Sequence, residues 1–137
     1  MPLTNVFQIA GSALTAQTLR LNAVASNLAN AESAHSSTGD GYKAKHVVFQ
    51  AMALNQGAPW AQGVHVKRVV EDPSPARLVF DPKHPLADDK GYVAYPNVDP
   101  VEEMVNMISA TRSFQTNAEV MDAAKTLMQR LLAVAQA

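Results

Sequence analysis

Cysteine is absent from this chain of 137 residues, and its absence removes several kinds of chemistry at once. Without cysteine there is no disulfide framework, no thiolate metal site and no cysteine nucleophile. The net charge of -1 also provides no general electrostatic field that would attract phosphate backbones or anionic lipids. Nucleic acids and membrane surfaces are therefore poor default partners, and binding must depend on shape and apolar contact.

Long apolar runs are absent as well, although 47% of the residues are hydrophobic, which is typical of a globular domain. No stretch approaches the roughly 18 consecutive apolar residues of a transmembrane helix. The N-terminal residues do not fit a signal peptide either, because no basic residue precedes Arg20 and polar residues interrupt the apolar segment. We therefore expect neither membrane insertion nor a cleaved signal peptide.

The residues from Leu3 to Ala31 predict a long helix, because apolar residues recur at steps of three and four. These are Leu3, Phe7, Ala10, Leu14, Leu21, Val24 and Leu28. The remaining face is unusual, since Arg20 is the only charged residue before Glu32 and the polar residues are amides and hydroxyls. Such a face suits a surface that becomes buried and hydrogen-bonded in a complex. We expect protein around most of this helix, and burial within its own domain is the open alternative.

A second long helix is predicted to begin at Asp99. Asp99 suits the N-cap, Pro100 the first helical position and Glu102 the capping-box position. From there an apolar stripe, widened by Ile108, continues at steps of three or four toward the C-terminus. The stripe consists of Met104, Met107, Thr111, Phe114, Ala118, Met121, Ala124, Met128, Leu131 and Ala135.

The segment between the helices has a different composition, with six of the eight prolines between Pro59 and Pro96. Four pieces rich in Val, Phe or Tyr and bounded by turn residues are expected to form one small sheet. They span residues 45–50, 64–70, 77–80 and 91–95. The predicted fold is mainly α with a small β-containing middle: an N-terminal assembly helix (1–33), a middle segment (34–96) and a C-terminal assembly helix (97–137). The two helices are expected to pair as a coiled coil.

The best candidate for metal chemistry is the acidic loop that contains Asp81, His84, Asp88 and Asp89. Its spacing matches no known metal motif, and its prolines favour an exposed turn. The chain also has no nucleophile elbow and no phosphate-binding glycine loop. We therefore predict no catalytic residue, no metal ligand and no cofactor, and keep a small metal-dependent enzyme using Asp81, His84 and Asp88 as a minor alternative.

Several motifs resemble those of the axial proteins that build the rod and hook of the bacterial flagellum. The N-terminal motifs are residues 12–16 (SALTA), 20–21 (RL) and 26–31 (SNLANA). The C-terminal helix is similar over residues 102–117, and residues 69–72, 77–82 and 91–98 (GYVAYPNV) add matches in the middle segment. Within this family the chain is most similar to the short subunits of the proximal rod.

This resemblance implies a structural role without enzymatic activity, in a rod formed by helical stacking around an export channel. Its implied partners are copies of the same chain, other flagellar rod proteins, an adaptor at the membrane ring and the flagellar type III export apparatus. The implied location is the periplasm-spanning rod of the basal body, reached without a cleaved signal peptide. A helical effector or translocator of a non-flagellar type III secretion system is the alternative.

The assembly interface is predicted from two sources. By position in the family motifs, the packing and hydrogen-bonding residues are Asn22, Asn27, Asn30, Arg112, Phe114 and Asn117. The apolar stripes of the two helices contribute Leu14, Leu21, Leu28, Met104, Ile108, Met121, Met128 and Leu131.

Overall fold

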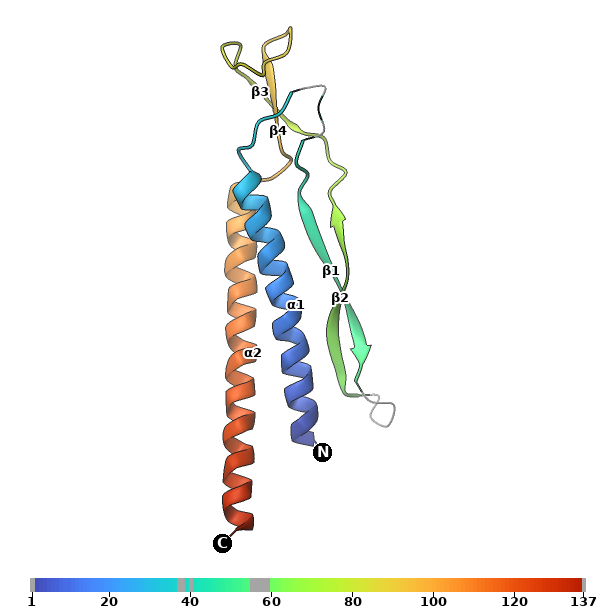
Figure 1. Ribbon diagram of the computed structural model, residues 1–137, viewed down its shortest axis with the longest axis vertical. Helices are drawn as coiled ribbons and strands as arrows, with labels where there is room; N and C mark the ends of the chain where they lie inside the picture. Colours follow the sequence, from blue (N-terminus) through green and yellow to red (C-terminus); the bar gives the residue numbers. More distant parts are fainter. Residues whose placement is uncertain (1, 37–38, 40, 55–59, 137) are drawn as a thin grey trace.

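The computed structural model describes residues 2–36, 39, 41–54 and 60–136. Helix α1 spans Pro2–Asn30 and helix α2 spans Pro100–Ala135. The helices lie side by side and run in opposite directions, so the start of α1 and the end of α2 lie toward the same end of an elongated molecule (Figure 1). The prediction of long terminal helices around a short-stranded middle segment is confirmed.

The middle segment contains β1 (Lys45–Ala53), β2 (Gln62–Glu71), β3 (Arg77–Phe80) and β4 (Tyr92–Tyr95), and each overlaps a predicted strand. The prediction that they form one sheet is wrong. Strand β1 pairs with β2 and β3 pairs with β4, in two separate antiparallel sheets. Pro73 and Pro75 lie in the link between β2 and β3, and they lack the N–H group with which the β2 ladder could continue.

Helix α1 occupies the centre of the arrangement. It lies between α2 and the β1–β2 hairpin, which runs along the helix (Figure 1). The shorter β3–β4 hairpin projects beyond the end of the helix pair. Helix α1 therefore contacts other elements on two sides, whereas α2 contacts α1 alone among the named helices and strands.

The buried core is small and lies where the helices meet the strands. Ala31, Ala44 and Val98 form a buried cluster with Tyr42 packed against it. Val93 of β4, five residues before Val98 in the sequence, is also completely buried. The core thus joins the ends of both helices to the beginning of β1 and the end of β4.

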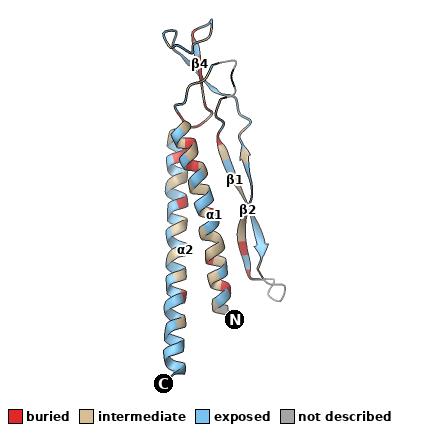
Figure 2. Ribbon diagram, in the orientation of Figure 1, coloured by how far each residue is buried: buried red, intermediate tan, exposed pale blue. Residues whose placement is uncertain are grey.

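Helix α2 is mostly exposed. Of its 36 residues, those that are buried are Glu103, Ala110 and Ala124. Figure 2 shows the exposed surface continuing along the whole length of the helix. A helix with so much exposed surface receives little of its stability from its own subunit, because most helical stability comes from tertiary packing.

Candidate assembly interface

The two helices pack through small side chains and one polar link. Ala110 is completely buried and Ala124 is 4% exposed, and small residues at such positions let two helix backbones approach closely. Nη2 of Arg20 donates a hydrogen bond to Oδ1 of Asn106 at 3.3 Å. Arg20 is the only charged residue of α1, so this is the hydrogen bond to α2 in which α1 contributes a charged side chain.

The predicted interface residues of α1 differ in how far their own chain covers them. Asn27 is completely buried, whereas Asn22 is exposed. Partial burial is shared by Leu14, Leu21, Leu28 and Asn30. Nδ2 of Asn30 donates to the carbonyl of Ser26 at 2.8 Å, so this amide is bonded within its own helix.

The predicted residues of α2 divide into two groups. Phe114, Asn117, Met121 and Met128 are partly buried. The exposed group is Met104, Ile108, Arg112 and Leu131. The seam with α1 therefore uses only part of the predicted stripe, and the exposed members lie on surface that the subunit itself does not cover.

Asn27 joins α1 to the start of β1. Its Oδ1 accepts hydrogen bonds from the backbone N–H of Lys45 and from the Tyr42 hydroxyl, both at 2.8 Å. Its Nδ2 donates to the carbonyl of Lys45 at 3.0 Å. Because the side chain is fully buried and all these bonds are made within one chain, Asn27 holds the hairpin against the helix inside the subunit.

A second attachment lies near the other end of the hairpin, and the sequence did not indicate it. The Ser12 hydroxyl accepts a hydrogen bond from the backbone N–H of Val64 at 3.0 Å and donates to the carbonyl of Ile9 at 2.7 Å. Gly63 makes this approach possible, since a Cβ there would lie 2.7 Å from the Ser12 oxygen. The hint in the sequence was a glycine between strand-forming residues, which often marks close backbone approach.

Asn97 makes a third attachment, and the sequence did not indicate this one either. Its Oδ1 accepts from the backbone N–H of Ala44 at 2.9 Å, and its Nδ2 donates to the carbonyls of Asp72 at 3.2 Å and Ser74 at 3.1 Å. One amide thereby ties the beginning of β1, the end of β2 and the approach to α2 together. Oδ1 of Asp99, two residues later, caps α2 by accepting from Val101 N at 2.8 Å.

Two groups of apolar side chains on α2 stay exposed. The first, which we call the outer patch, consists of Val101, Met104, Val105 and Ile108, with exposed fractions between 51% and 68%. Their spacing of three and four places them on one face, opposite the buried Glu103 and Ala110. The second, the end patch, consists of Leu127, Leu131, Leu132 and Val134, with exposed fractions between 53% and 76%.

The acidic loop uses its side chains to shape its own turns. Oδ1 of Asp88 accepts from the backbone N–H groups of Lys90 at 2.9 Å and Tyr92 at 2.8 Å. Oδ1 of Asp81 accepts from Lys83 N at 3.2 Å, and Nδ1 of His84 accepts from Leu86 N at 3.1 Å. Within the described ranges, no three His, Cys, Asp or Glu side chains are grouped closely enough to hold a metal ion.

The fold alters the ionisation of the Asp72 carboxylate. The hydroxyl and backbone N–H of Ser74 donate to its Oδ1 at 2.5 Å and 2.8 Å. Nε2 of His46 lies 3.5 Å from its other oxygen. The Ser74 bonds, with a smaller effect of His46, hold the pKa of Asp72 below its ordinary value of 3.8, because each stabilises the ionised form.

The described part of the chain contains no helix with the length and apolar character needed to cross a membrane. Its prominent surfaces are instead the exposed faces of a long amphipathic helix on an elongated scaffold. An elongated fold with two long terminal helices and exposed apolar helix faces is of the class formed by structural subunits.

Comparison with known proteins identifies the group within this class. Residues 7–33 match the family model described as "Flagella basal body rod protein". Residues 89–134 match the model described as "Flagellar basal body rod FlgEFG protein C-terminal". These two matches cover most of α1 and nearly all of α2.

Full-length relatives agree with the family models. The flagellar basal-body rod proteins FlgC of Yersinia enterocolitica and Escherichia coli O157:H7 are each 54% identical over 136 residues, which cover 99% of this chain and 100% of the relative. FlgC of Borreliella burgdorferi is 35% identical over 151 residues, with 99% of both chains covered. The chain therefore belongs to the FlgC family of flagellar basal-body rod proteins, which are structural rod subunits of the flagellar basal body and not enzymes.

Proposed function

We propose that this subunit assembles into the proximal part of the rod by packing its terminal helices against neighbouring subunits around a central export channel. The observation that supports this proposal is the outer patch of α2. It presents Val101, Met104, Val105 and Ile108 to solvent on the face opposite the contact with α1. A continuous apolar helix face of this kind is typical of protein interaction sites.

The exposed state of this face is costly in water, and contact with another subunit removes the cost. Each large apolar side chain contributes about 1.5–3 kcal/mol when it is fully buried. Among the named elements α2 packs against α1, and the patch on its other face stays between 51% and 68% exposed. Packing against a neighbouring helix therefore gives α2 a second contact surface, and the chain that supplies it is another rod subunit in our proposal.

The proposal also covers the finer partners and the location. These are copies of the chain and other rod proteins, an adaptor at the membrane ring, and the flagellar type III export apparatus, with assembly in the periplasm-spanning rod. Retention of the N-terminal segment is supported by α1, because Ser12 and Asn27 bind the β1–β2 hairpin in the folded subunit. Cleavage within this helix would remove groups on which the fold depends.

Deletion of the gene tests the role in the rod. We expect the deletion strain to build no hook and no filament, and the wild-type gene to restore both. Electron microscopy of isolated basal bodies measures how far the structure has grown. Hooks and filaments of normal length in the deletion strain would contradict a place in the proximal rod.

Ile108→Asp tests the outer patch. Ile108 is 67% exposed, so the change should alter the free energy of unfolding of the isolated subunit by less than about 0.5 kcal/mol. Assembly should fail, because packing would bury an unpaired charge. Immunoblots of isolated basal bodies measure incorporation.

Ser109→Asp is the matched control, since it adds the same charge at the next, exposed position outside the patch. It should be incorporated normally. If the Ile108 variant is incorporated as well as the Ser109 variant, the outer patch is not a subunit interface.

A further inference from the structure

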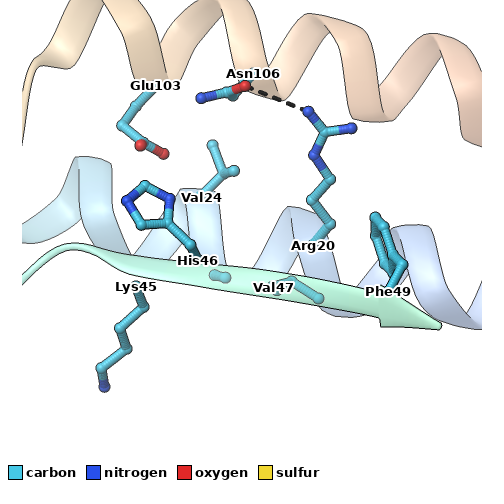
Figure 3. A pocket seen from close by; sticks show the side chains of 9 residues that line it. Arg20, Val24, Lys45, His46, Val47, Phe49, Glu103 and Asn106 are labelled. Carbon is cyan, nitrogen blue, oxygen red and sulfur yellow. Dashed lines mark hydrogen bonds between the residues drawn. The ribbon is translucent and has the colours of Figure 1, made fainter. Parts of the chain in front are cut away.

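A polar cavity of about 350 Å³ lies between α1, β1 and the beginning of α2. Its lining includes Arg20 and Val24 of α1, His46, Val47 and Phe49 of β1, and Glu103 and Asn106 of α2. Figure 3 shows the Glu103 carboxylate extending from α2 toward β1 and the Arg20 side chain reaching across from α1. The Lys45 side chain extends away from the cavity, and its Nζ lies 5.4 Å from the centre of the Tyr42 ring.

Glu103 is the unusual member of this lining. It is only 5% exposed, and its Oε2 has no hydrogen-bond partner among the described residues. Burying a carboxylate oxygen without a donor is costly, and buried polar groups in native proteins are almost always hydrogen-bonded. The position on α2 therefore calls for a hydrogen-bond donor that the described part of the subunit does not provide.

Arg20 offers the complementary group. A guanidinium carries five N–H donors, and the one hydrogen bond found for Arg20 in the described chain goes to Oδ1 of Asn106. Neither of the ion pairs found among the described residues involves Arg20 or Glu103. The cavity thus combines a carboxylate oxygen that needs a donor with a guanidinium that has donors to spare.

A primary amide matches both groups, because its NH₂ donates and its carbonyl oxygen accepts. A cation that binds Glu103 would be repelled by Arg20, and an anion that binds Arg20 would be repelled by Glu103, so each ion would gain one attraction and meet one repulsion. A neutral amide avoids both costs. The chain itself exposes amides on its two helices, at Gln8, Asn22, Gln115 and Gln129.

On the basis of the proposed function, we propose that this cavity receives an Asn or Gln side chain from a second copy of the chain in the assembled rod. The incoming NH₂ donates to Oε2 of Glu103, and the incoming carbonyl accepts from the Arg20 guanidinium. The cavity is then a polar recognition site that fixes how two subunits are aligned. The apolar outer patch lacks this directionality, because apolar contact does not depend on hydrogen-bond geometry.

Glu103→Leu separates this role from a purely structural one. In the isolated subunit the change removes a buried carboxylate that lacks a partner, so the thermal unfolding midpoint should rise. In the rod it removes the acceptor, so incorporation into basal bodies should fall roughly tenfold to hundredfold, the effect of one charge-assisted hydrogen bond. A stabilised variant that is incorporated normally would overturn the proposal.

Glu119→Leu is the matched control, since Glu119 is an exposed carboxylate on the same helix. It should leave incorporation unchanged. Glu103→Gln preserves the shape of the side chain and provides a second variant if the leucine variant does not fold. It should also be incorporated less well, because its carbonyl is a weaker acceptor than a carboxylate.

Disulfide mapping identifies the occupant, and the absence of cysteine makes introduced pairs unambiguous. Phe49→Cys at the cavity is combined in turn with cysteine at each of the four exposed amide positions, in basal bodies oxidised before gel analysis. We expect a covalent dimer of this chain from at least one amide position and none from the control Thr18→Cys. A cross-link to a different rod protein, or no cross-link at any amide position, would overturn the proposal.

Failure of the proposed rod function can be distinguished from failure of the cavity proposal. If the wild-type gene does not restore the rod in the deletion strain, the proposed function fails. If the wild-type and Glu103→Leu genes restore it equally, only the cavity proposal fails.

Discussion

The two long helices are covered by their own chain to very different extents. Helix α1 lies between α2 and the β1–β2 hairpin, and its polar residues Ser12 and Asn27 bind the hairpin backbone. Helix α2 contacts α1 alone among the named elements, and Ile108 and Val134 remain 67% and 76% exposed. Two uncharged polar residues of α1 are therefore bonded within the subunit, whereas the apolar outer face of α2 stays exposed.

This difference corresponds to two kinds of interaction. Hydrogen bonds are directional, so the bonds of Asn27 and Ser12 set the position of the hairpin along α1. Apolar burial is not directional and depends mainly on the area removed from water. An internal joint that must have one geometry therefore suits the polar residues, and a surface that meets neighbouring subunits suits the apolar ones.

Asn27→Ala should have the largest effect on the isolated subunit. The change removes a fully buried amide and leaves the N–H and carbonyl of Lys45 without their partner, which should cost about 3 kcal/mol in the free energy of unfolding. Asn22→Ala, on the exposed side of the same helix, should change it by less than about 0.5 kcal/mol. Chemical denaturation of both variants measures the difference. Equal small losses would show that the polar face of α1 is not an internal joint.

The glycine pair Gly63 and Gly11 should give intermediate effects of opposite sign. A Cβ at Gly63 would lie 2.7 Å from the Ser12 oxygen and 3.1 Å from Leu54, so Gly63→Ala should push the hairpin off α1 and cost about 2 kcal/mol. A Cβ at Gly11 would lie 3.7 Å from Met121, an ordinary contact, so Gly11→Ala should stabilise the helix by about 0.5–1 kcal/mol. Thermal unfolding of the two variants gives the comparison. A stabilised Gly63 variant would show that the hairpin is not held closely against α1.

Asp72→Asn should have the smallest effect, and it depends on pH. The folded-state pKa of Asp72 is depressed, so its contribution to stability is present above the ordinary value of 3.8 and is lost as the pH falls through the folded-state pKa. The wild type should therefore unfold at a slightly higher temperature than the variant at pH 7. The gap should close in buffers below pH 3.8. A gap that does not change with pH would show that the bonds of Ser74 do not depend on the charge.

The structure and the family comparison give no support to the alternative of a small metal-dependent enzyme. Asp81 and Asp88 are engaged in turns with their own loop, and the family consists of structural proteins. The predicted assembly role of individual residues, among them Ile108 and Leu131, stays a prediction. Their exposure makes them available for contact, and the experiments on the outer patch test whether that contact occurs.

Local patterns in the sequence determined the elements of this protein. The three- and four-residue apolar steps predicted both helices, and Asp99 with Pro100 marked the start of α2, because side-chain periodicity and capping involve neighbours within one or two turns. The four strands were predicted for a similar reason, since runs of Val, Phe and Tyr between turn residues favour extended backbone. These signals depend on residues only a few positions apart.

Only the tertiary structure decided how these elements are joined. Two hairpins form where one sheet was expected, and the hydrogen bond between Ser12 and Val64 connects residues 52 positions apart in the sequence. The burial of Glu103 likewise requires α1 and β1 to converge on the beginning of α2. Such contacts depend on how helices and hairpins pack in three dimensions, and the pattern around a single residue does not contain that information.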